Sequence, residues 1–411
     1  MNRVIENKKL SGEIQAITSK SYAHRALFCA ALAEGESIIE IEDISKDIES
    51  SINSIRALGV EIIKKDNKFH IKPPKSFKKN VTIDVYESGT TLRLLLPIIA
   101  ILGISAKIIR HGTLINRTNS VYFNLFPKHG VNIYEKNECI FLEGKLSNYN
   151  FELPGNISSQ FISGLLIASG YSSKDFNIRI TTEIESKPYI CMTIDVMKKF
   201  GANVIEKNNL YICKNNFKAT NYIVERDWSN ALFFLVTGIE VKGLNKNSKQ
   251  GDKNALKFLK SLGYENISMG NFKLSKIKDA KERIILDAKD MPDVVPILSI
   301  ISALSNKKIE VINIKRLKLK ESDRIKSTIE MLNNLGIAVN LFENSFSFNG
   351  LDNFKSTTIN SYNDHRIAMA ASIAATFADG PITIINSQCV EKSYKNFFHD
   401  FESLGGITHV I

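Results

Sequence analysis

The feature that most constrains how this 411-residue chain can fold is a short pattern that occurs six times. Each copy is an amphipathic segment of helical period, a glycine that stops the helix, and then a β-branched run. The stopping glycines recur roughly every 60 to 75 residues, at Gly59, Gly130, Gly201, Gly263, Gly336 and Gly405. The chain is therefore predicted to repeat one helix–strand unit six times.

A second helix is predicted to precede the amphipathic helix in every copy. The predicted starts lie near Thr18, Gly89, Ser158, Asp227, Pro292 and Asp364. These segments are richer in apolar residues than the amphipathic ones, so we expect them to be more buried. Each unit then consists of a strand, a buried helix, a strand, an exposed helix and further strands. This βαβαββ pattern requires parallel strand pairs with right-handed crossovers.

Six such units exceed one hydrophobic core, so two domains of three units are expected. The predicted N-terminal domain spans residues 14–226. The predicted C-terminal domain combines residues 1–13 with 227–411, because a strand at Arg3–Leu10 precedes the first complete unit. The chain would cross between the domains twice, near residues 10–14 and 224–228, and a hinge is expected there.

Composition excludes several classes of protein. The net charge is +11, but lysine and arginine are spread along the chain rather than gathered in a stripe, so attraction of small anions explains the charge without nucleic acid. No apolar run reaches membrane length and no basic leader follows Met1. The five cysteines are odd in number and scattered, without metal or redox spacing. We expect a cytoplasmic protein with reduced thiols and no metal, nucleic-acid or membrane partner.

The most polar helix start lies in the fifth unit, at Lys320-Glu321-Ser322-Asp323-Arg324. Residues 316–320 alternate in polarity, which predicts a strand or extended edge that leads to the N-terminus of an amphipathic helix. Backbone N–H groups point outward at such a terminus and bind anions. A single charged run of this kind more often marks a solvated helix start.

Similar polar groups open five of the buried helices, and this recurrence favours a functional site. The motifs lie at Thr18–Arg25, Glu87–Arg93, Gly155–Phe161, Asp290–Asp293 and Asn363–Arg366. Each alone is a weak signal, because serine or threonine at a helix start is usually only a cap. Several such termini converging on one point suit a pair of multiply anionic substrates. Neither a Walker loop nor a Gly-x-Ser-x-Gly elbow is present.

Eight motifs, in this order, resemble the 5-enolpyruvylshikimate-3-phosphate synthase family over essentially the whole chain. They are Ser19-Lys20-Ser21 with His24-Arg25, Ser88-Gly89-Thr90 with Arg93, Ser158-Ser159-Gln160-Phe161, Ser186-Lys187-Pro188-Tyr189-Ile190, Asp290 with Pro292-Asp293, Lys320–Arg324, Asp364-His365-Arg366 and Lys392-Ser393-Tyr394. The resemblance implies a two-domain inside-out α/β barrel with three βαβαββ units per domain. The six repeats counted above agree with this fold independently.

The resemblance also implies a reaction of the shikimate pathway that leads to chorismate and the aromatic amino acids. The enolpyruvyl group of phosphoenolpyruvate moves to the 5-hydroxyl of shikimate 3-phosphate, and phosphate leaves through a tetrahedral intermediate. No metal or organic cofactor takes part, and a monomer is expected. The family is the target of glyphosate, and the Ser-Ser-Gln form at Ser158 resembles its sensitive members. Glu87 departs from the family, which frequently has Asn at this position.

Site residues are transferred from the family motif by motif. The implied contacts to shikimate 3-phosphate are Lys20, Ser21, Arg25, Ser158, Ser159, Gln160, Ser186, Tyr189, Asp293 and Lys320. The implied contacts to phosphoenolpyruvate are Lys20, Gly89, Arg117, Gln160, Arg324, Arg366 and Lys392. Asp293 matches the acceptor of the hydroxyl proton, and Glu321 matches the donor to the enol carbon, with Lys20 as the competing donor. Because the motifs come from both halves of the chain, the two domains are expected to close on substrate.

Three other interpretations remain open at this stage. A sibling enolpyruvyl transferase acts on UDP-N-acetylglucosamine, but it typically has a Lys-Asn pair where this chain has Lys20-Ser21, and a loop cysteine that residues 111–116 lack. A nucleic-acid-binding repeat protein would bind with steep salt dependence, but acids such as Asp293 would repel phosphates. A catalytically dead homologue is disfavoured by the intact set of acid, base and cations.

Overall fold

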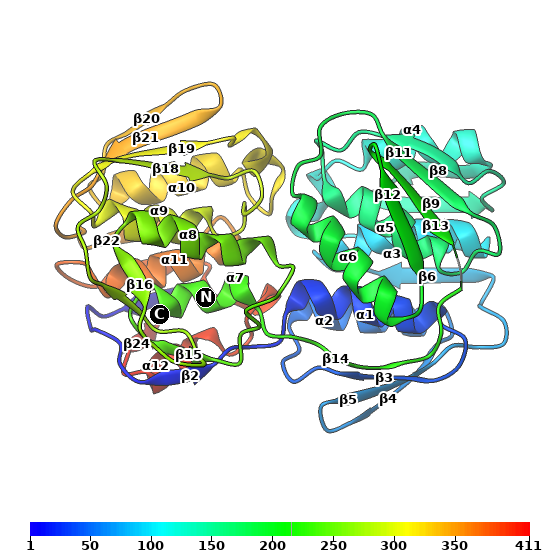
Figure 1. Ribbon diagram of the computed structural model, residues 1–411, viewed down its shortest axis with the longest axis horizontal. Coiled ribbons are helices and arrows are strands. Elements are labelled where there is room, and N and C mark those ends of the chain that lie inside the picture. The colour runs from blue at the N-terminus through cyan, green and yellow to red at the C-terminus, as the bar shows by residue number, and fades with distance from the viewer. Residues whose placement is uncertain (215) are drawn as a thin grey trace. The chain divides into compact units, whose positions relative to one another are not determined.

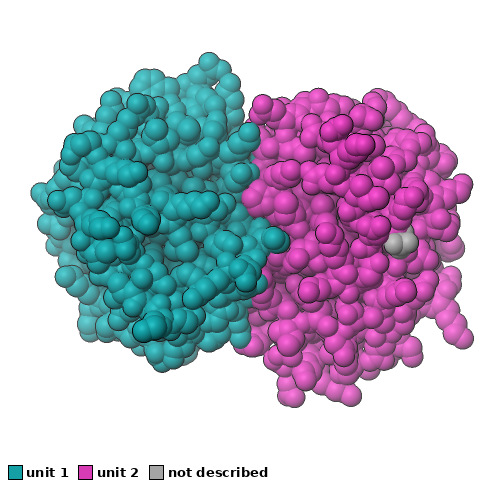
Figure 2. Space-filling view, in the orientation of Figure 1, with its two compact units in different colours: residues 1–17, 226–411 teal, residues 18–225 magenta. Residues whose placement is uncertain are grey.

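The computed structural model describes residues 1–214 and 216–411, and the chain divides into two compact units (Figures 1 and 2). Unit 1 combines residues 1–17 with 226–411, and unit 2 spans residues 18–225. Strand β2 (Glu13–Gln15) pairs in parallel with β15 (Glu240–Lys242). Residues 14–17 and Arg226 therefore belong to unit 1, whereas the sequence assigned them to the N-terminal domain, and the first crossing between the units lies at residues 17–18 rather than near 10–14.

Unit 2 contains three four-stranded sheets with the same pairing. In each sheet the first two strands are parallel and the remaining pairs are antiparallel. The orders are β14-β3-β5-β4, β6-β7-β9-β8 and β10-β11-β13-β12. The strands are β3 (Ser37–Glu40), β4 (Glu61–Lys65), β5 (Lys68–Lys72), β6 (Asn80–Asp84), β7 (Ser105–Ile109), β8 (Val131–Lys136), β9 (Cys139–Gly144), β10 (Asn150–Leu153), β11 (Phe176–Ile180), β12 (Asn203–Lys207), β13 (Leu210–Lys214) and β14 (Asn221–Ile223).

The helices of unit 2 fall into a buried set and an outer set. The buried helices are α1 (Lys20–Leu32), α3 (Gly89–Leu102) and α5 (Ser159–Ser169), and they contact one another. The outer helices are α2 (Lys46–Ala57), α4 (Ser120–Leu125) and α6 (Lys187–Lys199), with 3₁₀ turns η1 (Gly112–Asn116) and η2 (Phe126–His129). Strands such as β10 alternate between exposed and buried residues, whereas α5 is buried on every face. The sheets therefore face solvent and the apolar helices fill the centre, as the sequence predicted.

Unit 1 repeats this plan. Two sheets have the orders β18-β19-β21-β20 and β22-β23-β1-β24, and a third is divided into β15-β2 and β16-β17, with a bridge between Val241 and Phe272. The strands not yet described are β1 (Arg3–Ile5), β16 (Tyr264–Asn266), β17 (Leu274–Lys276), β18 (Arg283–Asp287), β19 (Lys308–Ile312), β20 (Val339–Leu341), β21 (Ser345–Asn349), β22 (Thr357–Asn360), β23 (Ile382–Ile385) and β24 (Thr408–Val410). The buried helices are α7 (Trp228–Leu235), α9 (Val295–Ala303) and α11 (His365–Ala375). The outer helices and 3₁₀ turns are α8 (Ala255–Ser261), α10 (Arg324–Asn334), α12 (Phe397–Ser403), η3 (Gly251–Asn254), η4 (Lys315–Leu319) and η5 (Ser387–Lys392).

Two strands close these sheets from distant parts of the sequence. Strand β14, at the end of unit 2, pairs in parallel with β3 of the first repeat. Strand β1, at the start of the chain, lies between β23 and β24 of the last repeat. Neither sheet is complete without a strand from the other end of its unit, so local sequence patterns alone do not define the repeats.

One local prediction was wrong. Residues 315–319 form the 3₁₀ turn η4 rather than a strand, and the helix that follows begins at Arg324. Ile314 and Leu317 are both buried while Leu319 is exposed. The three-residue spacing of Ile314 and Leu317 fits the period of a 3₁₀ helix. The alternation of polarity in the same segment fits a strand equally well, so the sequence pattern did not distinguish the two.

Candidate active site

The buried helices of unit 2 begin with the same capping device. Ser19, Ser88 and Ser158 are the N-caps of α1, α3 and α5, and each side chain accepts a hydrogen bond from a backbone N–H of the first turn. These caps satisfy one N–H group of each helix, and the other N–H groups of the first turn still favour negative charge. The three termini contribute Lys20 and Ser21, Gly89, and Ser159 and Gln160, all of which were predicted as site residues.

Arg25 is the most unusual group of unit 2, because it is a fully buried cation with neutral hydrogen-bond partners. Its Nε donates to Thr193 Oγ1 at 2.8 Å, Nη1 to the Ser21 carbonyl at 2.6 Å and Nη2 to the Tyr189 carbonyl at 3.0 Å. No carboxylate pairs with it in residues 1–214 or 216–411. Burial lowers the pKa of Arg25 to about 10. A desolvated charge of this kind is stabilised when an anion binds beside it.

Lys20 is held by an acid that the sequence did not single out. Its Nζ lies 2.9 Å from Asp47 Oδ2, and both side chains are largely buried. Asp47 is in the first turn of α2, where a carboxylate also interacts favourably with the helix dipole. This pair fixes the position of the ammonium group at the start of α1. The only signal for Asp47 was its place as an acid at a helix start.

Gly89 and Arg117, both predicted to contact phosphoenolpyruvate, touch each other. A β-carbon added at Gly89 would lie 2.7 Å from Arg117 Nη1 and 3.0 Å from its Cζ. The glycine therefore lets the guanidinium approach the N-terminus of α3. A backbone N–H terminus and a guanidinium at this distance form an anion site together.

Gln160 links α5 to α3. Its Nε2 donates to Thr90 Oγ1 at 2.8 Å, and its Oε1 accepts from Arg93 Nη1 at 2.7 Å. Arg93 also donates through Nη2 to the Thr118 carbonyl at 3.0 Å. Thr90 and Arg93 were part of the motif but not of the predicted site, and the structure shows that they orient the Gln160 amide.

The start of α6 carries the remaining predicted residues of unit 2. Ser186 is buried with a φ of +53°, in the left-handed region that is uncommon for residues other than glycine. This turn lets the Tyr189 carbonyl reach Arg25. The structure therefore brings Ser186 and Tyr189 to the same helix ends as Ser21 and Arg25 through direct hydrogen bonds between α1 and α6.

In unit 1 the corresponding centre is Arg324, a fully buried arginine surrounded by carboxylates. Its Nε and Nη2 bind Asp364 Oδ2 and Oδ1 at 3.0 and 3.2 Å, which is a bidentate contact. Nη1 lies 2.9 Å from Asp293 Oδ1, and Nη2 lies 2.7 Å from Glu321 Oε2. Burial opposes the charged form, but Asp364, Glu321 and Asp293 outweigh it and raise the pKa of Arg324 above its ordinary value.

Asp293 is held in its ionised form. Lys320 Nζ lies 3.0 Å from its Oδ1, and Arg324 contacts the same oxygen. Burial would raise the pKa of Asp293, but the charges of Lys320, Arg324 and Arg366 hold it well below its ordinary range. Burial in turn lowers the pKa of Lys320. A carboxylate with so low a pKa becomes an effective base only if its cations are drawn to another anion.

Arg366 and Lys392 lie near this network. Arg366 Nη1 donates to Asn230 Oδ1 at 3.2 Å, while its buried Nε has no hydrogen-bond partner within the described chain. Lys392 Nζ donates to the Asn363 carbonyl at 2.9 Å. Arg366 thus keeps one buried donor for a ligand, which suits a group predicted to bind phosphoenolpyruvate.

Asp364 and Asp252 are network residues that sequence reasoning did not assign to the site. Asp364 caps α11, accepts from the Arg366 backbone N–H at 2.9 Å and receives the Ser322 hydroxyl at 3.0 Å. Asp252 is fully buried and accepts from the Ser229 hydroxyl. Burial, followed by the charge of Asp293, raises the pKa of Asp252 to about 7. No sequence motif marks Asp252, because its partners come from other elements.

Asp323 and Ser322 complete the polar stretch. Asp323 is the N-cap of α10 and accepts a hydrogen bond from the Lys326 backbone N–H. Among the described residues, no three histidine, cysteine, aspartate or glutamate side chains are grouped to hold a metal ion. Within the same part of the chain, every helix is too short or too polar to cross a membrane.

Two α/β units of three repeats, with cations and serine caps at the ends of buried helices, suit an enzyme that binds small anionic substrates. The chain belongs to the EPSP synthase (3-phosphoshikimate 1-carboxyvinyltransferase) family, whose model matches residues 4–401.

Relatives and solved structures agree with this assignment. The chain is 41% identical to the 3-phosphoshikimate 1-carboxyvinyltransferase of Clostridium acetobutylicum, over 97% of this chain and 96% of the relative. It is 39% identical to the protein of the same name from Clostridium novyi, with the same coverage. An EPSP synthase structure from Acinetobacter baumannii matches all of both chains with a TM-score of 0.78 at 22% identity. This likeness confirms the predicted fold class.

Proposed function

We propose that this chain is a 3-phosphoshikimate 1-carboxyvinyltransferase, which transfers the enolpyruvyl group of phosphoenolpyruvate to the 5-hydroxyl of shikimate 3-phosphate and releases phosphate. Family membership over nearly the whole chain supports the reaction. The observation that carries the proposal is the burial of Arg25 beside converging helix termini without a carboxylate partner in the described residues. Such a site requires an anionic substrate.

Two of the proposed shikimate 3-phosphate contacts, Ser21 and Tyr189, bond directly to Arg25, which is a third. Ser21 and Tyr189 accept hydrogen bonds from that guanidinium through their backbone carbonyls, which leaves the second N–H of each terminal nitrogen for a phosphate. Hydroxyl groups at the starts of α5 and α6 supply further donors. The full proposed set is Lys20, Ser21, Arg25, Ser158, Ser159, Gln160, Ser186, Tyr189, Asp293 and Lys320.

The proposed phosphoenolpyruvate contacts are mostly cations. Arg117 at the Gly89 terminus and Arg366 with its unpaired Nε are the two best supported by geometry. A guanidinium suits carboxylate and phosphate, because it offers two parallel donors. The full proposed set is Lys20, Gly89, Arg117, Gln160, Arg324, Arg366 and Lys392.

Proton transfer is assigned to Asp293 and Glu321. In the addition step the 5-oxygen bonds to C2 of phosphoenolpyruvate, its proton goes to Asp293, and Glu321 protonates the methylene carbon. In the elimination step a methyl proton returns to the enzyme and the C2–O bond to phosphate breaks. Substrate anions would compete for Lys320 and Arg324, which would raise the proton affinity of Asp293 and of Glu321. Lys20 stays the alternative proton donor.

An assay of phosphate release tests the proposal. Purified protein with phosphoenolpyruvate should release phosphate with shikimate 3-phosphate and not with UDP-N-acetylglucosamine. Release with only the nucleotide sugar would contradict it. Turnover is expected to persist after treatment with a metal chelator, because the chemistry needs only acids, bases and cations.

Three further statements stay predictions. The five free cysteines support a reducing compartment such as the cytoplasm. A monomer would be checked by light scattering. Closure of the two domains on substrate would be checked by small-angle scattering with and without shikimate 3-phosphate and glyphosate.

A further inference from the structure

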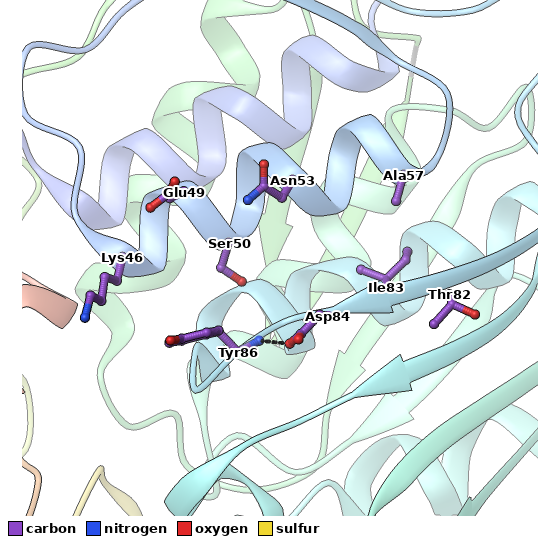
Figure 3. A pocket seen from close by; sticks show the side chains of 9 residues that line it. All are labelled: Lys46, Glu49, Ser50, Asn53, Ala57, Thr82, Ile83, Asp84 and Tyr86. Carbon is purple, nitrogen blue, oxygen red and sulfur yellow. Dashed lines mark hydrogen bonds between the residues drawn. The ribbon is translucent and has the colours of Figure 1, made fainter.

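A hollow of about 430 Å³ lies in unit 2, and the proposed reaction does not use it (Figure 3). It is enclosed by one face of α2 and by β6 with the turn that follows it. The lining residues are Lys46, Glu49, Ser50, Asn53, Ala57, Thr82, Ile83, Asp84 and Tyr86. The α2 members follow a spacing of three or four residues and so form one continuous face. The volume falls in the range that small-molecule sites occupy.

Ser50 is the residue that indicates a bound ligand. Its side chain is directed toward the side of the hollow where Asp84 and Tyr86 lie (Figure 3). The residue is 5% exposed, and its Oγ has no hydrogen-bond partner within the described residues. A buried hydroxyl without a partner costs free energy, and a ligand atom that donates to it or accepts from it removes that cost.

The charge and shape of the lining select the ligand. The acidic residues Glu49 and Asp84 and the basic residue Lys46 line the hollow, and Asp84 Oδ2 also lies 2.9 Å from His111 Nε2. Tyr86 adds an aromatic ring that is half exposed, and Ile83 adds an apolar surface. Carboxylates, a hydroxyl acceptor and an aromatic face together favour an organic ammonium ion with a flat apolar body.

The walls of the hollow are also the segments that hold the proposed active site. On α2, Asp47 pairs with Lys20, and Ser51 bonds to His24 Nδ1 at 2.7 Å and to Thr91 Oγ1 at 2.8 Å. Tyr86 precedes Gly89 by three residues. Its φ of +55° is held in part by a hydrogen bond from its backbone N–H to Asp84 Oδ1 at 2.7 Å. A ligand between α2 and this turn therefore contacts both segments that support the site. One segment holds Lys20 at the N-terminus of α1, and the other leads to Gly89 at the N-terminus of α3.

We propose that this hollow is an effector site for a small aromatic ammonium ion, and that its occupation alters turnover through α2 and the turn before α3. The effect on turnover rests on the proposed function, whereas binding does not. The two are therefore measured separately, on the full chain.

Binding is tested by calorimetry with phenethylamine, without substrates. One site per chain is expected, and phenylacetate, which has the same ring but a negative charge, is expected not to bind. Asp84→Asn keeps the acceptor for the Tyr86 N–H and should weaken phenethylamine binding about tenfold or more, because a charge-assisted hydrogen bond is lost. Ser50→Ala removes a hydroxyl without a partner, so it should leave thermal stability unchanged while weakening the amine several-fold.

The matched control is Glu138→Gln, a carboxylate-to-amide change in the loop between β8 and β9, outside the hollow. It should bind phenethylamine like the wild type. No binding, equal binding of phenylacetate, or equal loss in the control would overturn the site. In a phosphate-release assay, saturating phenethylamine should change turnover of the wild type and not of Asp84→Asn. Binding without any change in turnover would overturn the effector role alone.

Discussion

Arg25 on the buried helix α1 of unit 2 and Arg324 at the start of the outer helix α10 of unit 1 are both fully buried, but their surroundings are opposite. The donors of Arg25 meet two carbonyls and a hydroxyl, and burial lowers its pKa to about 10. Arg324 contacts Asp364, Asp293 and Glu321, which raise its pKa.

The difference separates two tasks. A cation with neutral partners has unbalanced charge and gains stability only when an anionic ligand arrives. A cation among three carboxylates is already balanced, and its main effect is to hold those carboxylates in place. We infer that unit 2 chiefly binds phosphate, whereas unit 1 chiefly positions the groups that transfer protons.

The largest expected effect concerns the proposed proton-transfer groups of unit 1. Glu321→Gln and Asp293→Asn should each lower kcat by about 10²–10⁴-fold, because an amide neither gives nor takes the proton. Binding of shikimate 3-phosphate, measured by calorimetry, should change far less. Asp323→Asn is the control, since asparagine caps a helix as well as aspartate does. Near-normal turnover in either variant would refute the assigned role.

The second prediction contrasts the two arginines directly. Arg324→Met should destabilise unit 1 by about 3–5 kcal/mol, because three carboxylates lose their shared cation. Arg25→Met should change stability by no more than about 1 kcal/mol, since relief of a desolvated charge offsets the lost hydrogen bonds. It should nevertheless abolish shikimate 3-phosphate binding.

Urea unfolding of the two variants measures this contrast. Arg283→Met, which removes an exposed pair with Glu310, is the control and should cost less than about 1 kcal/mol. Equal destabilisation by the changes at Arg25 and Arg324 would contradict the inferred difference between the two arginines.

A third prediction uses two acids of unit 1 whose pKa values move in opposite directions. The pKa of Asp252 is raised to about 7, chiefly by burial, so its ionisation destabilises the fold. This penalty is absent below the unfolded pKa, grows as pH rises and is complete above about 7. Asp252→Asn should therefore gain on the order of 2 kcal/mol relative to wild type between pH 5 and pH 8.

The ionisation of Asp293 has the opposite effect on stability, because the pKa of Asp293 is lowered by folding. The stability that its ion pairs contribute is present above its unfolded pKa and is lost only as pH falls through its low folded pKa. Stability curves of Asp252→Asn across this pH range check the sign. Asp175→Asn, an exposed change of the same kind, is the control, and a pH-independent stability difference between Asp252→Asn and the wild type would contradict the raised pKa of Asp252.

The smallest expected effect lies in unit 2. Gly89→Ala places a methyl group 2.7 Å from Arg117 Nη1, so the guanidinium must move. The KM for phosphoenolpyruvate should rise about tenfold, by loss of roughly one charge-assisted contact. Inhibition by glyphosate should weaken as well, whereas the affinity for shikimate 3-phosphate should hold. Ser120→Ala, an exposed site three residues after Arg117, serves as the control in steady-state kinetics.

The fold was predictable where the sequence signal is local. Stopping glycines and apolar periods mark both helices of every repeat, because each signal spans one or two helical turns. The supports of the site were not predictable, because they join distant segments. Asp364 lies 40 residues from Arg324, and Asp47 lies 27 residues from Lys20. The roles of single residues came from the resemblance to the family, and patterns of charge and spacing would not have assigned them.

The pairing of β14 with β3 also affects how the protein is made. The sheet of the first repeat lacks a strand until residues 221–223 have left the ribosome. The first sheet of unit 2 therefore cannot be completed until nearly all of unit 2 has been translated. The sheet of the last repeat needs residues 3–5 and 408–410 together. Strand β1 must therefore wait, unpaired, until β23 and β24 have been synthesised, and unit 2 is expected to fold ahead of unit 1 during synthesis.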